Sequence, residues 1–321
     1  MSTINYALTH LFSQLSRKWI PLPQTEKHYD EFDFYALSRG DWLSYIKEGL
    51  NARNRPEWVS AFRKKVVKSM LLPEIADRIH HHFEMLNRLG GKYIPYNSPH
   101  FPTMLKHVPD PPAAISALGS LCNMKTPCLA IVGSRKASGF ALFESEKLAT
   151  WIGDQGVTVV SGGALGVDRA AHCGTLNCTQ SPSPGIVVLP SGLDRLYPSA
   201  NKHIFSLLLR EKALFISEKL CGHTPYHWDF PTRNRIISGL SVATIIMQAD
   251  IRSGAMSSAG WALNQGRDVF VLEHPQDDIR AQGSHHLIET GAVGFRSAED
   301  FMINLFPLCL DNLGKISPKS F

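Results

Sequence analysis

The fold is decided by residues 129–172, which read LAIVGSRKASGFALFESEKLATWIGDQGVTVVSGGALGVDRAAH. The stretch opens on a short apolar run and a glycine, continues through a helix-length segment, and returns to a second apolar run followed by glycines. Strand, helix and strand in this order form one unit of a parallel sheet, because two parallel neighbours need a crossover between them. The near-continuous apolar character of both runs predicts strands that are buried on both faces.

The same alternation of strands and helices continues to residue 272. Predicted strands cover 129–132, 157–160, 186–189, 213–217, 243–247 and 269–272. Helix-length segments between them include 140–152, 168–176, 200–210 and 257–264. This order is typical of an α/β fold with a doubly wound, mostly parallel sheet. Ligands of such sheets bind beyond the carboxyl ends of the strands, at the point where the strand order reverses, so the residues after each strand are the candidate site.

The chain before residue 92 has a different, helical pattern. Apolar residues recur at helical spacing between residues 58 and 67 and between residues 75 and 89, and Gly90-Gly91 is a helix stop. Six prolines between residues 95 and 112 predict an extended segment. The predicted organisation is a small helical N-terminal domain over 1–91, a Pro-rich connector over 92–128, the α/β domain over 129–307 and a C-terminal tail over 308–321.

The composition is that of a globular protein and places limits on the binding site. The chain has 321 residues, of which 44% are hydrophobic and 19% charged. It lacks both an apolar run of eighteen residues and an N-terminal signal pattern, which predicts a cytoplasmic protein without a membrane span. The net charge of +5 is uneven, with 14 basic against 10 acidic residues in 1–95 and 15 against 16 in 130–300. An anion site in the larger domain must therefore come from a few locally placed groups.

Cysteine and histidine spacing gives no sign of a metal or cofactor. The six cysteines form no CxxC pair, and the chain is too long to need a disulfide framework. His80-His81-His82 and His285-His286 lack the spacing that places metal ligands on one helical face. Neither a Walker motif nor GxGxxG occurs, which disfavours nucleoside triphosphates and dinucleotides. We predict no metal and no cofactor.

Two glycine-containing turns follow the first two strands. In the first, Gly133-Ser134-Arg135-Lys136 combines backbone N–H groups, a small residue and two cations, which together favour phosphate binding. The second begins with Ser161-Gly162-Gly163 and reaches Gly166. Glycines at the end of a parallel strand let the backbone approach a phosphate or base, or serve tight turn geometry alone.

Two later turns repeat this chemistry. Arg233-Asn234-Arg235 lies before the fifth strand, and residues two apart in a helical turn do not share a face. One arginine can therefore bind an anion while the other braces the fold. Ser253-Gly254 follows the fifth strand and precedes a helix. Catalytic patterns are weak, and Asp168 and His172, four residues apart, are predicted to form a structural pair instead of a catalytic one.

Taken in order, these strings resemble the DprA/Smf family of DNA-processing proteins over about residues 92–295. Order and spacing make the match specific, whereas any one string would be weak. The matching strings are Phe101-Pro102, Asp110-Pro111-Pro112, Gly133-Ser134-Arg135, Ser161-Gly162-Gly163, Gly166-Val167-Asp168, Ala171-His172, Gly192-Leu193-Asp194, Tyr197-Pro198, Asn201, Ser217-Glu218, Arg233-Asn234-Arg235, Ser253-Gly254 and Gly266-Arg267.

The resemblance implies an extended Rossmann-like domain that dimerises, binds single-stranded DNA and delivers it to a RecA-type recombinase during natural transformation, with no catalytic activity. In the family a Gly-Ser-Arg loop holds phosphates, and a lysine with an aromatic residue three positions later contacts the strand, here Lys202 and Phe205. The alternative for Phe205 is a core residue whose replacement lowers stability instead of DNA binding. Some of the late apolar residues, such as Trp261, Leu287 and Phe301, would form an exposed patch for the homodimer, and the alternative is that they pack beneath the sheet. The expected DNA-binding residues are Gly133, Ser134, Arg135, Ser161, Gly162, Gly163, Lys202, Phe205, Arg233, Asn234, Arg235, Ser253 and Gly254.

The sequence departs from the family pattern at several places, among them Ser257-Ser258 in place of a threonine-containing turn and a lengthened segment from Asn177 to Pro184. Leu165 stands where arginine is usual, Gln248 where glutamate is common, and Glu273 where a proline-glycine pair is typical. The loss of a cation at Leu165 predicts weaker DNA binding.

Two other function classes remain open. One is an enzyme like the nucleotide phosphoribohydrolases, although their Pro-Gly-Gly-x-Gly-Thr-x-x-Glu signature is absent. The other is a nucleotide-binding sensor that uses the same glycine-rich loops. A strand-binding groove prefers oligonucleotides over mononucleotides and a nucleotide pocket does not, so length dependence separates them.

Overall fold

The computed structural model describes residues 72–179 and 184–309, together with His10, Leu11, Gln14, Ala36 and Ser38. The helix expected between residues 58 and 67 and most of the tail expected at 308–321 lie outside the described residues. The helix expected between residues 75 and 89 is present as α4 (Leu72–Arg88). Its apolar positions Ile75, Ile79, Phe83 and Leu86 are buried, as the spacing predicts.

The described chain forms one nine-stranded sheet with the order β1-β2-β6-β5-β4-β3-β7-β8-β9. Neighbours from β6 through to β9 are parallel, whereas β1 and β2 are antiparallel additions at the β6 edge. The order reverses between β3 and β7, so the predicted doubly wound, mostly parallel sheet and its six strands are confirmed. The strands are β1 (Lys92–Pro95), β2 (Ala114–Leu118), β3 (Cys128–Val132), β4 (Thr158–Ser161), β5 (Ile186–Leu189), β6 (Leu214–Ser217), β7 (Ala243–Ile246), β8 (Asp268–Leu272) and β9 (Val293–Phe295).

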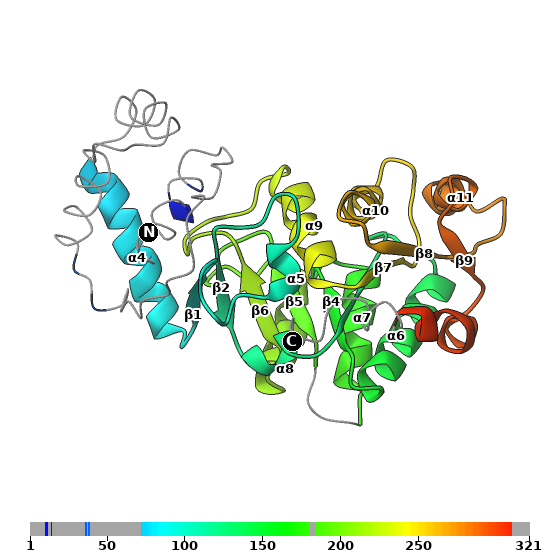
Figure 1. The fold of residues 1–321 in the computed structure, drawn as a ribbon, viewed down its shortest axis with the longest axis horizontal. Helices are drawn as coiled ribbons and strands as arrows, with labels where there is room; N and C mark the ends of the chain where they lie inside the picture. The colour runs from blue at the N-terminus through cyan, green and yellow to red at the C-terminus, as the bar shows by residue number, and fades with distance from the viewer. Residues whose placement is uncertain are drawn as a thin grey trace.

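Helices cover both faces of the sheet (Figure 1). One face carries α6 (Gly139–Asp154), α7 (Val167–Leu176) and α8 (Lys202–Arg210). The other carries α9 (Asp229–Leu240), α10 (Gly254–Asn264) and α11 (Gln282–Glu289). Shorter elements are α5 (Thr103–Lys106), α12 (Ala298–Asp300), η1 (Leu121–Met124), η2 (Ser199–Asn201), η3 (Ile279–Ala281) and η4 (Phe301–Leu305).

The sheet separates two layers of core, as the apolar strands predict. In β3, Ala130 and Val132 belong to the cluster that contains residues of α9 and α10. Leu129 and Ile131 belong to the cluster that contains residues of α6 and α7. Because successive side chains of a strand point to opposite faces, a strand covered by helices on both faces must be apolar throughout.

The segment predicted as a connector contributes to the sheet. Within residues 92–128, β1 pairs with β2, and β2 pairs with β6 through Ser116 opposite Ser217 and Leu118 opposite Phe215. The prolines lie at the end of β1 and in the turns between the two strands, which is where a missing N–H group is tolerated. We did not predict these strands, because the proline content outweighed their short apolar runs.

Two of the late apolar groups that were expected at an exposed patch are buried. Phe301 is fully buried between Phe270 and Phe295, and Leu287 is buried in the core beside α9 and α10. The indole of Trp261 donates to the Pro231 carbonyl. Leu287 and Phe301 are therefore core residues and do not belong to the exposed patch that some of these apolar groups were expected to form. No helix in the part of the chain that the structure describes is both long and apolar enough to cross a membrane.

Candidate nucleic-acid interface

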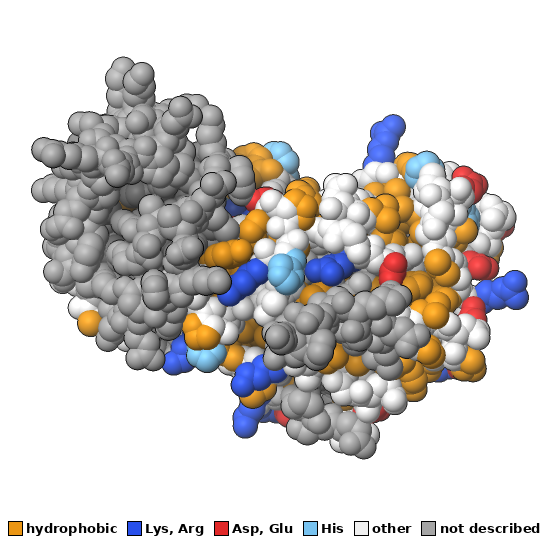
Figure 2. Space-filling view, viewed as in Figure 1, with side chains coloured by type: hydrophobic (Ala, Val, Ile, Leu, Met, Phe, Trp, Pro, Cys, Tyr) orange, Lys and Arg blue, Asp and Glu red, His pale blue; other side chains and the backbone are white. Residues whose placement is uncertain are grey.

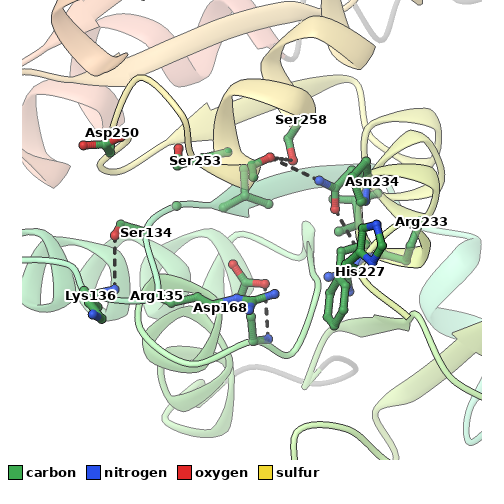
Figure 3. A pocket seen from close by; sticks show the side chains of 18 of the residues that line it. Ser134, Arg135, Lys136, Asp168, His227, Arg233, Asn234, Asp250, Ser253 and Ser258 are labelled. Carbon is green, nitrogen blue, oxygen red and sulfur yellow. Dashed lines mark hydrogen bonds between the residues drawn. The ribbon is translucent and has the colours of Figure 1, made fainter. Parts of the chain in front are cut away.

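A pocket of about 650 Å³ opens at the carboxyl end of the sheet, where the strand order reverses between β3 and β7. Figure 3 shows Arg135 and Lys136 on one side, Arg233 and His227 on the α9 side, and Ser253 on a third side. The predicted residues that line it are Gly133, Ser134, Arg135, Arg233, Asn234, Ser253 and Gly254. The switch point thus brings together parts of three of the four predicted motifs.

The loop after β3 is fixed by backbone hydrogen bonds. Ser134 N–H donates to the Gln248 carbonyl at 2.8 Å, and the Ser134 hydroxyl accepts from Lys136 N–H at 3.1 Å. The Ser138 hydroxyl caps α6 by accepting from Ala141 N–H. This bracing leaves Arg135 and Lys136 exposed at the pocket, on a backbone that is already ordered.

The glycine-rich loop after β4 is organised mainly from within the protein. The buried Asp168 carboxylate accepts from the N–H groups of Gly162 and Ala164 at 3.2 and 3.3 Å. The Ser161 hydroxyl donates to the Ile131 carbonyl, and a Cβ at Gly162 would overlap the Arg233 guanidinium. Ser161, Gly162 and Gly163 do not line the main pocket, although Gly162 lines a small adjoining pocket of about 60 Å³. These glycines serve close packing, and the Gly162 N–H group, which was expected to meet a ligand, is already occupied by Asp168.

The predicted pair of Asp168 and His172 does not form. Asp168 turns to the glycine loop, while both ring nitrogens of the buried His172 lack a hydrogen-bond partner among the described residues. Burial and the Arg233 charge lower the pKa of His172 to about 3. His172 is therefore a neutral core residue at neutral pH.

The two arginines of α9 have different roles. Arg233 lines the pocket and donates through Nη1 to the carbonyls of Gly162, at 2.5 Å, and Val188. Burial and the neighbouring Arg135 charge lower its pKa to about 10, opposed by Asp168, so it is cationic at neutral pH. Asn234 Nδ2 donates to the Gly254 carbonyl and joins α9 to α10.

Arg235 points away from the pocket. Its Nη2 lies 2.7 Å from Glu218 Oε1, and its Nε lies 2.9 Å from Asp110 Oδ2. The side chain is 4% exposed, so no phosphate can reach it in this structure. The prediction that Arg235 contacts DNA is therefore corrected, because the residue neutralises two carboxylates inside the fold. It is the bracing arginine of the predicted pair.

Phe205 is also a core residue. It is fully buried, and its ring meets Phe215 edge-on at 5.6 Å between centroids. A base cannot stack on it in this conformation, so the predicted stacking role is wrong. Lys202, the first residue of α8, is exposed but does not line the pocket. Asn201 beside it donates to the Gly163 and Ala164 carbonyls and ties α8 to the glycine loop.

The pocket contains groups that sequence reasoning missed. Arg280 lines the pocket and forms an ion pair with Asp278 at 2.9 Å. Phe230 also lines the pocket, and the Arg135 guanidinium lies over its ring, 4.8 Å from the centroid. Neither Arg280 nor Phe230 belongs to a glycine-containing turn. The only sequence signal for Phe230 is the nearby string Arg233-Asn234-Arg235. Asp250 also lines the pocket.

Electrostatic attraction in this pocket is local. The lining cations are Arg135, Lys136, Arg233 and Arg280, and the lining carboxylates are Asp168 and Asp250. Figure 2 shows the basic side chains of the visible described surface separated by hydrophobic and neutral groups. Within residues 72–179 and 184–309, no cluster of three or more His, Cys, Asp or Glu side chains could hold a metal ion. The arrangement can bind an anion that also has an apolar or aromatic part.

The fold and the pocket together define the class: a Rossmann-like α/β protein with a cationic ligand site at its topological switch point. Comparison with known families gives the finer assignment. The family described as DNA recombination-mediator protein A matches residues 92–306, and the chain belongs to this family.

Several relatives support the assignment. Protein Smf of Escherichia coli is 33% identical over 257 residues, which cover 80% of this chain and 64% of the relative. The match covers 56% of Protein Smf of Synechocystis, so this chain spans less than two thirds of the length of these two relatives. DNA processing protein DprA of Streptococcus pneumoniae is 36% identical over 202 residues, which cover 63% of this chain and 70% of the relative.

Two solved structures share the fold. DprA of Streptococcus pneumoniae has a TM-score of 0.65 at 26% identity and covers 86% of this chain and 99% of its own. DNA processing protein A of Helicobacter pylori has a TM-score of 0.59 at 29% identity and covers 70% of this chain and 96% of its own. The Helicobacter structure is described as revealing a unique single-stranded DNA binding mode.

Proposed function

We propose that this chain binds single-stranded DNA at the switch-point pocket and delivers it to a RecA-type recombinase. The supporting observation is the convergence of Arg135, Lys136, Arg233 and Arg280 on one pocket in a member of a recombination-mediator family. Cations that converge on a concave site, beside a ring such as Phe230, suit a strand whose phosphates and bases are both accessible. Lys202 and the exposed turn before it supply an outer phosphate contact.

The proposed protein acts by holding the strand, without chemical turnover, in the cytoplasm and as a homodimer. The pocket pairs its carboxylates with internal partners: Asp168 accepts from two loop N–H groups, and Asp250 accepts from Arg252 N–H. Repurified protein that hydrolysed DNA or nucleotides, and lost this activity on Asp168→Asn substitution, would contradict the proposal.

The salt dependence of binding tests the site. Each lost phosphate contact should flatten the slope of log affinity against log salt by about 0.7. We expect Arg135→Ala and Lys202→Ala each to weaken binding of a labelled thymidine 20-mer and to flatten the slope by about that amount. Arg210→Ala is the matched control, since Arg210 is exposed at the C-terminal end of α8 and lines no part of the pocket. Unchanged slopes in both pocket-side variants contradict the proposed site.

A nucleotide-binding sensor is the second candidate, and the pocket volume favours it. A volume of about 650 Å³ falls within the range of about 300–1,000 Å³ that is usual for small-molecule sites. Titration with thymidine oligonucleotides of one to twenty residues separates the two functions. Affinity that rises with length supports strand binding, whereas affinity that is complete at one nucleotide supports the sensor.

A further inference from the structure

Two large aromatic side chains lie exposed on the loop that leads into α9. Tyr226 is 46% exposed and Trp228 is 42% exposed. Their ring centroids lie 4.9 Å apart and their planes differ by 11°, so the rings are stacked. Exposed aromatic pairs of this kind place a large apolar area in water and are enriched at binding surfaces.

The backbone that carries this aromatic pair is anchored. The buried Asp229 carboxylate accepts from His223 Nε2 at 2.8 Å, from Tyr226 N–H at 2.8 Å and from Lys219 Nζ at 2.9 Å. Burial opposes ionisation of Asp229, but these donors lower its pKa to about 2, so the carboxylate stays charged. The rings are thus exposed on a fixed loop, and binding a planar partner needs little further ordering.

The aromatic pair is continuous with the pocket. His227, between the two residues, lines the pocket, and its ring centroid lies 4.4 Å from that of Trp228. On the first turn of α9, Phe230 also lines the pocket and meets the ring of the 40% exposed Tyr197 at 5.7 Å. A run of aromatic rings therefore extends from the Arg135 cation, through Phe230 and His227, to Trp228.

We propose that Tyr226 and Trp228 form a stacking platform for bases of the DNA strand where it leaves the pocket. The inference rests on the proposed function and names the part of the site that contacts bases. A strand held by its phosphates at Arg135 carries unpaired bases beside this surface, and every base has a face that can stack on an aromatic ring. The platform supplies the base contact that the buried Phe205 cannot, and it is tolerant of sequence.

Substitutions at Trp228 test the platform. Stacking contributes about 1–3 kcal/mol per base, which corresponds to roughly 5- to 150-fold in affinity. We expect Trp228→Ala to weaken binding of a thymidine 20-mer by a factor in that range without changing the salt slope, and Trp228→Phe to retain most of the affinity. Phe143→Ala, which removes a 63% exposed ring on α6, is the matched control.

Strands without bases complete the experiment. A 20-mer of abasic residues should bind wild-type protein more weakly than the thymidine 20-mer, and Trp228→Ala should cause no further loss with it. Urea unfolding should show equal stability of all variants. The platform is overturned if Trp228→Ala loses the same affinity for intact and abasic strands. It is also overturned if Trp228→Ala binds with wild-type affinity while Arg135→Ala binds more weakly. Either result leaves the proposed function standing. Failure of the wild-type protein to bind either strand overturns the proposed function itself.

Discussion

Replacing Arg235 with methionine should damage the fold and spare the DNA site. The guanidinium is 4% exposed and contacts Glu218 Oε1 at 2.7 Å and Asp110 Oδ2 at 2.9 Å. Removing one partner of a buried ion pair destabilises a protein by about 3–5 kcal/mol, because a buried charge loses its compensation. The free energy of unfolding of a domain is usually about 5–15 kcal/mol. The variant should therefore remain folded but lose a large part of its stability.

The destabilisation by Arg235→Met should depend on pH. In the wild-type protein burial raises the pKa of Glu218, but the charge and hydrogen bond of Arg235, together with His10 and Lys219, outweigh burial and hold the pKa below its usual value. Glu218 therefore stabilises the wild-type fold above its unfolded pKa, and this stabilisation is lost as the pH falls. Without Arg235, burial raises the pKa of Glu218, and the variant loses stability as the pH rises. The difference between the two proteins should be larger at pH 7.5 than at pH 4.5.

Urea unfolding followed by circular dichroism measures this difference, and two further variants interpret it. Adding Glu218→Gln to Arg235→Met should recover part of the stability, because it removes the unpaired charge. Arg135→Ala should leave stability within about 0.5 kcal/mol of wild type, since the side chain is exposed. A loss below 1 kcal/mol in Arg235→Met, together with a flatter salt slope for DNA, would refute the structural role and restore Arg235 as a phosphate contact.

Three further outcomes are expected. Phe205→Ala should lower the free energy of unfolding in urea by about 3–5 kcal/mol, because it leaves a cavity at a fully buried site. Unchanged stability together with weaker DNA binding would contradict the core role of Phe205. Burial lowers the pKa of His82 to about 3, so this histidine stabilises the fold above pH 6.5. The free energy of unfolding should therefore fall by roughly 2 kcal/mol between pH 7 and pH 5. A His82→Gln variant whose stability has the same pH dependence as wild type argues against this role. Gln248 accepts from Ser138 N–H and donates to Asp278 Oδ2 at 2.9 Å, so Gln248→Glu should be less stable at pH 8 than wild type and closer to it at pH 5, whereas a constant difference refutes like-charge repulsion as the cause.

The central sheet could be predicted because each of its strands carries the same local signal. Residues 129–132 and 186–189 are fully apolar, and only burial on both faces selects such runs. The position of the site could be predicted because ligands of such sheets bind where the strand order reverses. This rule depends on the order of the strands and does not depend on individual side chains. The strands outside this pattern were missed: β1 ends in Pro95, and β9 has only three residues, one of them Gly294.

The individual site residues were less predictable, because their roles depend on partners far away in sequence. Nothing near Arg235 shows that Asp110, 125 residues earlier, and Glu218, 17 residues earlier, neutralise it. Phe205 is different, since the positions of Ile204, Phe205 and Leu208 on α8 already match a buried helical face. The spacing favoured a core residue there, and the family pattern directed attention away from it.

The antiparallel pair β1 and β2 determines how the chain can be shortened. Strand β6 is buried on both faces, and β2 occupies its outer hydrogen-bonding side. A truncation at the predicted 128/129 boundary would leave β6 as a bare apolar edge, which can template pairing between molecules. The outermost strand β1 carries Lys92 at its start and Pro95 at its end, two residues that discourage such pairing. A soluble minimal fragment therefore has to begin ahead of Lys92, because the first two strands protect the sheet from aggregation.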